Sequence, residues 1–175
     1  EKIFGKLSEC NLNMGHISLP RPVVNPQYIR GKKPILPSLL GLSRKQTEDI
    51  CNHILCYNKK TKELSSLVNI SNEECKDYLT GGEAIEKMLR EKGVSSQYIV
   101  LHNLPVLPVS LRVVFNEDGD LDHYYSIQYL YKRVLSRKNR LLKLEEFKAP
   151  DIILINERRM LEIEASCLII NGAFE

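Results

Sequence analysis

Residues 127–144, IQYLYKRVLSRKNRLLKL, and residues 149–170, APDIILINERRMLEIEASCLII, decide the fold of this chain. The first stretch carries apolar residues at a heptad-like spacing, namely Ile127, Leu130, Val134, Leu141 and Leu144. Arg137 interrupts that seam, and Pro150 ends the helix. The second stretch has an apolar stripe of Met160, Ile163, Cys167 and Ile170. We therefore predict an antiparallel hairpin over residues 124–172, with helices of about 20 and 15 residues joined around residues 146–153.

The residues before the hairpin predict a smaller, mixed body. Prolines crowd the first 40 residues, which favours extended segments and short strands, and Tyr98–Leu101 predicts another strand. Ser43 with Gln46 forms a capping box that opens a helix. A second box, Ser71 with Glu74, predicts a helix through Leu79 that Gly81 and Gly82 end, followed by a helix over residues 84–92. The residues between Tyr57 and Leu64 predict a polar turn, and residues 66–70 a short strand.

Taken together, these patterns predict a mainly α fold with small β elements. We expect a compact body over residues 1–123 and a protruding antiparallel coiled coil over residues 124–172. The 175 residues are 43% hydrophobic and 27% charged, which supports a packed core and argues against disorder. The net charge of +3 is compatible with a nucleic acid or an acidic protein as partner.

Cysteine and histidine usage argues against a metal site. The five cysteines have no CxxC spacing, so neither a disulfide framework nor a structural zinc site is expected. The four histidines are scattered, and Asp118, Asp120 and Asp122 lack the later ligands of a calcium loop. No apolar run approaches the length of a membrane span, and we expect a cytoplasmic protein with no membrane partner. Since the chain begins at Glu1 without a methionine, we expect a fragment or a trimmed product.

The first arm of the hairpin is strongly basic. Its acidic residues are Glu145 and Glu146, and its cationic residues are Lys132, Arg133, Arg137, Lys138, Arg140, Lys143 and Lys148. Charges of one sign along a helix repel one another, so such a face suits an anionic partner, although a merely solvated face is the plainer interpretation. The second arm is mixed in charge, and its glutamates are candidates for pairing with the first arm.

A family resemblance appears at this hairpin. Residues 131–141, YKRVLSRKNRL, and 149–161, APDIILINERRML, resemble the clamp-helix segment of the largest subunit (β′) of bacterial-type DNA-directed RNA polymerase. Further family-like motifs stand upstream in the same order: LHNLPVLPVSLR at 101–112, GEAIEKML at 82–89, MGHISLPRPV at 14–23 and EKIFG at 1–5. The combination is specific, whereas any one motif alone would be weak.

The resemblance implies a role in transcription. In the family this hairpin anchors a sigma-type initiation factor, and the strand-turn before it, here residues 111–123, is the lid. By position, the residues implied in sigma binding are Arg137, Asn139, Arg140, Asn156, Glu157, Arg159 and Glu164. Those implied to lie near nucleic acid are Arg112, Lys132 and Arg133. Other polymerase subunits, and DNA through the assembled clamp, are the remaining implied partners. An ion pair of Arg137 with Glu157 or Glu164 inside the hairpin is the structural alternative.

The sequence also departs from the family pattern. The four-cysteine zinc ribbon is absent between the EKIFG and MGHI segments, the lid is acidic, and Glu164 replaces a small residue. The aspartate-rich loop that holds catalytic magnesium in the family is also absent, so we expect no cofactor and no catalysis from this segment alone. The clamp of a polymerase, a free-standing module that sequesters a sigma factor, and a DNA-binding hairpin with steeply salt-dependent affinity all remain open.

Overall fold

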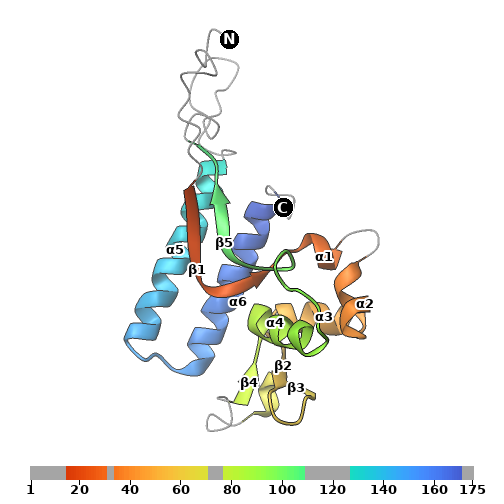
Figure 1. Cartoon of the computed structure of the whole chain (residues 1–175). Helices are drawn as coiled ribbons and strands as arrows, with labels where there is room; N and C mark the ends of the chain where they lie inside the picture. Colours follow the sequence, from red (N-terminus) through yellow and green to blue (C-terminus); the bar gives the residue numbers. More distant parts are fainter. Residues whose placement is uncertain (1–14, 31–33, 71–76, 109–126, 171–175) are drawn as a thin grey trace.

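Two long antiparallel helices form one side of the molecule (Figure 1). The computed structural model describes residues 15–30, 34–70, 77–108 and 127–170. Helix α5 spans Ile127–Glu146 and helix α6 spans Asp151–Ile169, joined by a short turn that ends at Pro150. The predicted hairpin is therefore confirmed, with a second arm longer than expected. The predictions for the lid, Arg112, Cys10 and the Ser71 capping box lie outside the described residues.

A two-stranded sheet lies against the hairpin. Strand β1 (Gly15–Val24) pairs antiparallel with β5 (Val100–Val106), and the register is irregular between Ser18 and Val23. The irregular stretch contains Pro20 and Pro22, which cannot donate hydrogen bonds to a partner strand. Both α5 and α6 contact β1, and α4 (Gly81–Glu91) also contacts it. The sheet thus joins the hairpin to the rest of the chain.

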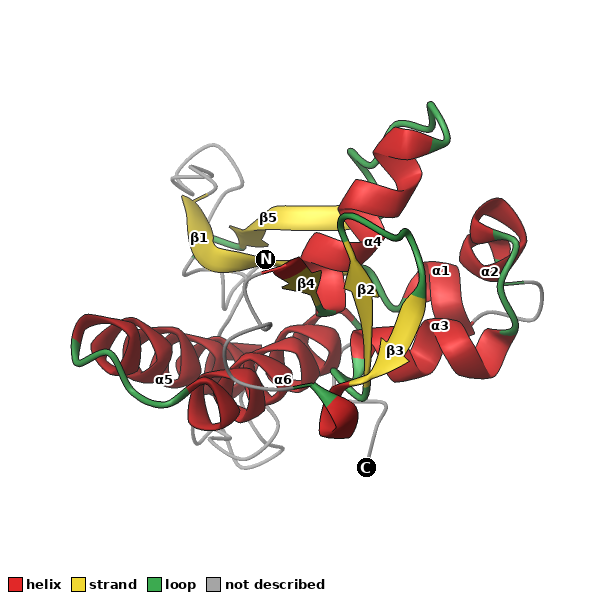
Figure 2. Cartoon of the chain, turned by 90° about the horizontal axis from the view of Figure 1, so that it is seen from below, coloured by secondary structure: helices red, strands yellow, loops and turns green. Residues whose placement is uncertain are grey.

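The remaining elements form a body of short helices and a small sheet (Figure 2). Its helices are α1 (Gln27–Arg30), α2 (Ile35–Leu40), α3 (Arg44–Cys51) and α4. Its antiparallel strands, in the order β3–β2–β4, are Leu64–Ser66, Leu55–Asn58 and Tyr78–Leu79, and a 3-10 turn follows at Leu67–Asn69. The capping box that begins α3 is present, since Ser43 and Gln46 exchange hydrogen bonds of 3.0 and 3.1 Å.

Several local predictions for the body are wrong. Leu79 is not helical but pairs with Tyr57 in β2, a strand that occupies part of the predicted polar turn. Gly81 and Gly82 begin α4 instead of ending a helix. A Cβ atom on Gly82 would collide with the main-chain oxygen of Pro22, so this glycine permits the close approach of α4 to β1. Tertiary packing therefore overrides the local propensity at these positions.

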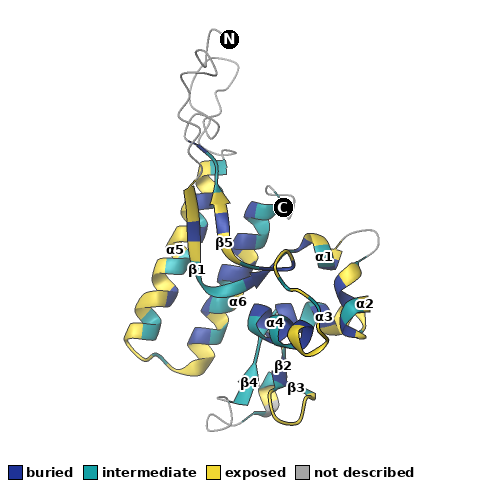
Figure 3. Ribbon diagram, viewed as in Figure 1, coloured by how far each residue is buried: buried dark blue, intermediate teal, exposed yellow. Residues whose placement is uncertain are grey.

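Buried residues gather in two cores (Figure 3). The body core contains Leu36, Ile50, Ile85, Leu89 and Val100, among others. The hairpin core combines Val134, Leu141, Leu154, Leu161 and Leu168 with Ile17, Val23 and Leu104 from the sheet. The apolar stripe predicted for α5 is confirmed, but that for α6 is wrong: Ile163 is 41% exposed, and the buried stripe contains Leu154, Leu161 and Leu168 instead. The predicted fold class, mainly α with small antiparallel sheets, is confirmed.

Candidate functional site

Three arginines of α5 pair with two buried glutamates of α6. The shortest approaches are 2.7 Å between Arg133 and Glu164, 3.2 Å between Arg137 and Glu157, and 3.2 Å between Arg140 and Glu157. Glu157 and Glu164 are only 3% and 7% exposed, and a buried carboxylate needs such partners to remain charged at low cost. The hydrogen bond with Glu164 is the main reason that the pKa of Arg133 is raised. We call these five residues the arginine ladder, and it holds the two arms together.

A second group of ion pairs ties the hairpin to the body. Arg21 of β1 contacts Glu83 of α4 at 2.6 Å and Glu145 of α5 at 3.0 Å. Arg158 of α6 reaches the same Glu145 oxygen at 3.3 Å. Four elements from distant parts of the sequence therefore share one partly buried network, which restricts how the hairpin can rotate on the sheet.

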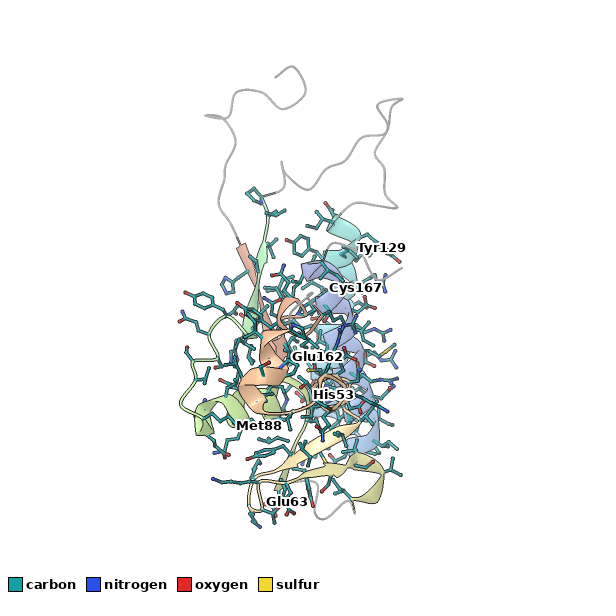
Figure 4. The ribbon with its side chains drawn as sticks, turned by 90° about the vertical axis from the view of Figure 1, so that its right-hand side faces the viewer. His53, Glu63, Met88, Tyr129, Glu162 and Cys167 are labelled. Atoms are coloured by element: carbon teal, nitrogen blue, oxygen red, sulfur yellow. The ribbon has the colours of Figure 1, made fainter. Side chains whose placement is uncertain are left out.

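A buried polar junction fixes the other side of α6. The Nε2 atom of His53 lies 3.1 Å from Oε2 of Glu162, and its Nδ1 atom lies 2.8 Å from the hydroxyl of Thr80. The other oxygen of Glu162 accepts the main-chain N–H of Val24 at 3.1 Å. Figure 4 shows His53 and Glu162 side by side between body and hairpin. Gly81, at φ +57°, leaves room for the ring, since a Cβ atom there would lie 2.5 Å from it.

The structure separates the predicted sigma-binding residues into two groups. Glu157 and Glu164 are the buried carboxylates of the ladder, and the Arg137 side chain is only 27% exposed, so the alternative of an ion pair within the hairpin describes these three. The other predicted residues are exposed: Asn139, Arg140, Asn156 and Arg159. Of the residues predicted near nucleic acid, Lys132 is exposed and Arg133 belongs to the ladder.

One face of α6 is open along its length. Ile152, Asn156, Arg159 and Ile163 follow one another at spacings of four, three and four residues, which places them in a single row on a helix. All four are exposed, and Nη2 of Arg159 lies 3.4 Å from the side-chain oxygen of Asn156. We call this row the α6 stripe. Its two isoleucines were not predicted as surface residues, because the periodicity alone does not say which apolar row faces inward.

The tip of the hairpin is apolar and cationic at once. Phe147 and Ile152 are each 77% exposed, and Lys143 and Lys148 are exposed beside them in the sequence. Large apolar side chains rarely gather in the open on a protein without a partner. The arrangement is therefore suited to binding another macromolecule.

The described ranges contain no cluster of three or more histidine, cysteine or acidic residues that could hold a metal ion. Within the same ranges, no helix combines the length and the hydrophobicity that crossing a bilayer requires.

Comparison with known proteins shows similarity to β′ subunits of DNA-directed RNA polymerase. No protein-family profile matches it. The DNA-directed RNA polymerase subunit β′ of Thermoanaerobacter pseudethanolicus is 28% identical over an alignment of 208 residues, which covers 91% of this chain and 18% of that subunit. The β′ subunit of Chlorokybus atmophyticus is 26% identical, with 91% of this chain and 31% of the subunit covered. That of Clostridium beijerinckii is 33% identical over 132 residues, which cover 75% of this chain.

The chain spans less than a third of the length of each of these relatives. The alignment nevertheless covers 91% of this chain. This chain is thus a distant homologue of the β′ subunit of DNA-directed RNA polymerase, similar to one part of that much longer protein.

Proposed function

We propose that this chain is the clamp segment of a β′-type polymerase subunit and that its hairpin docks a sigma-type initiation factor. The observation that carries the proposal is the α6 stripe together with the neighbouring Arg140, whose side chain is 63% exposed. Of these residues, Arg140, Asn156 and Arg159 coincide with positions that the family resemblance implies in sigma binding, and Ile152 and Ile163 add exposed apolar contacts beside them. Other polymerase subunits, and DNA through the assembled clamp, are the further partners that we propose.

The rigidity of the hairpin supports this function. A docking surface gains affinity when its side chains and backbone are already held in the bound arrangement. The arginine ladder joins the two arms, while the Arg21 network and the His53–Glu162 junction join both arms to the body. Glu157 and Glu164 therefore act from inside the hairpin, positioning the arginines instead of contacting the partner.

The composition of the surface favours a protein partner over naked DNA. A DNA-binding face is dominated by cations that meet phosphates, whereas protein interfaces combine arginines with exposed apolar anchors. Here exposed arginines alternate with Ile152, Ile163 and Phe147. Guanidinium groups beside apolar contacts suit a partner helix that carries carboxylates.

A direct binding measurement tests the proposal. The probe is region 2 of the primary sigma factor of Thermoanaerobacter pseudethanolicus, titrated against the full chain by fluorescence anisotropy. The variants are Arg159→Glu, which reverses an exposed charge of the α6 stripe, and Arg140→Glu, which reverses an exposed charge that also pairs with Glu157; circular dichroism checks that both remain folded. The control is Arg90→Glu on α4, whose side chain is 74% exposed and pairs with Glu86 in the same helix.

We expect each hairpin variant to weaken binding by about tenfold or more, as reversal of a charge at an interface does, and the control to bind like the wild type. Absence of wild-type binding, or equal binding by all variants, would refute the dock. Affinity for a plain DNA duplex that equals the affinity for the factor and collapses with salt would point instead to a DNA-binding hairpin.

A further inference from the structure

A groove lies between the C-terminal half of α6 and the body. It holds about 150 Å³ and lies between the end of β1, helices α1 and α3, and α6. Val24, Ile29 and Cys51 form its floor, Ile163 forms a wall, and Arg30 and Arg159 stand at its edge. A cavity of roughly this volume accommodates a benzene-sized group, so the groove has room for one bulky apolar side chain.

The floor of the groove is apolar and neutral. Val24, Ile29 and Cys51 are 1%, 5% and 8% exposed. Burial, and then the charge of the nearby Glu162, raise the pKa of the Cys51 thiol well above its usual range. The thiol therefore stays protonated and behaves as a small hydrophobic group. Such a floor favours the binding of an apolar side chain and disfavours that of a charged one.

The edge of the groove offers positive charge. Arg30 and Arg159 are both exposed there. The carboxylates that also line the groove are engaged elsewhere: Glu48 pairs with Arg44 at 3.0 Å, and Glu162 faces His53 and the N–H of Val24. Arg30 and Arg159 thus place positive charge at the edge, which suits a carboxylate next to the inserted side chain.

The groove continues the α6 stripe. Arg159 and Ile163 belong to both, so a helix lying along the stripe from Ile152 would reach the groove without leaving the surface of α6. The two features together form one track from the hairpin tip to the body.

We propose that this groove receives a bulky apolar side chain, flanked by a carboxylate, from an acidic helix of the factor that docks on the hairpin. The inference rests on the proposed function and extends it, because it adds the body residue Arg30 to the contact. A second copy of this chain is a poorer occupant, since it would bring its own Arg30 and Arg159 against the same arginines.

Two variants probe the groove: Arg30→Glu lies outside the α6 stripe, and Ile163→Asp lies where the groove and the stripe meet. Ile163→Asp places a charge on the wall at a position that is already 41% exposed, and Arg30→Glu reverses the edge on the body. Arg90→Glu again serves as the control, and circular dichroism checks that every variant remains folded. The full chain is titrated with the same sigma region 2 probe, and a photoreactive benzoylphenylalanine at position 163 reports direct contact.

We expect binding to weaken about tenfold for Ile163→Asp and about fivefold for Arg30→Glu, with cross-linking from position 163 to the probe. Wild-type affinity in both variants, while Arg140→Glu still loses binding, would overturn the groove and leave the dock standing. No binding by the wild type would remove both. A chain that self-associates, and that Ile163→Asp converts to a monomer, would show that the groove holds a second copy and would also overturn the proposal.

Discussion

Glu157 provides a quantitative test of the arginine ladder. Its carboxylate is buried, accepts a hydrogen bond from Arg137 at 3.2 Å and forms an ion pair with Arg140 at 3.2 Å, yet the two arginine side chains differ in exposure, at 27% and 63%. If Glu157 is lost, water can solvate the Arg140 guanidinium group far more easily than that of Arg137. Exposed pairs contribute at most about 1 kcal/mol, whereas breaking a buried pair costs about 3–5 kcal/mol.

Glu157→Gln keeps the shape of the side chain but removes its charge. We expect it to lower the free energy of unfolding by about 2 kcal/mol, between those limits, because Arg137 is a quarter exposed and regains some hydration. For a chain of this length, the loss corresponds to a fall in Tm of roughly 4–8 °C. Glu146→Gln, at an exposed position on the same hairpin, is the matched control and should leave Tm unchanged.

Double-mutant cycles identify which arginine matters. Urea denaturation of Glu157→Gln combined with Arg137→Met should give a coupling of about 1–2 kcal/mol, and the cycle with Arg140→Met a coupling below about 0.5 kcal/mol. The reasoning is refuted if Arg140 couples to Glu157 as strongly as Arg137 does, or if neither couples.

Three further predictions follow from the body. Burial, and then the 2.6 Å hydrogen bond to Glu91, raise the pKa of Tyr57 to about 12. In the unfolded chain this phenol ionises near pH 10. The stability that the protonated Tyr57 contributes is therefore complete below pH 10 and is lost as the pH rises to 12. Tyr57→Phe should show a shallower fall of Tm over that interval than the wild type. Gly82→Ala should lower the free energy of unfolding by about 1–3 kcal/mol in urea, because the new methyl group meets the Pro22 carbonyl, and an unchanged midpoint would contradict that contact. The Cys51 thiol should react with iodoacetamide far more slowly in the native protein than in urea, as followed by mass spectrometry, and equal rates would show that it is not buried.

The hairpin was predictable from sequence because its signals are local. The apolar spacing in α5 depends on neighbouring residues only and is confirmed, and α5 ends at Glu146, four residues before Pro150, which is the N-cap of α6. The orientation of α6 was not predictable in this way, because apolar residues lie on more than one of its faces. Which row is buried depends on where β1 and the body stand, and that information is absent from the periodicity.

The polar contacts were the least predictable part of the site. His53 and Glu162 are 109 residues apart, and no sequence motif links the two. Arg21 reaches Glu145 across 124 residues. The possible pairing of Arg137 with Glu157 could be foreseen from the charges of the two arms, but the burial of Glu157 could not, because it depends on packing of the whole hairpin.

The hairpin core, which the two helices share with the sheet, has a consequence for engineering. Ile17, Val23 and Leu104 pack in the same core as the two helices, although they come from strands far away in the chain. A peptide of the two helices alone would expose to solvent the apolar residues that now pack against the strands. It would tend to aggregate or to pair its helices in the wrong register. The smallest piece worth grafting onto another scaffold is therefore the hairpin with both strands attached.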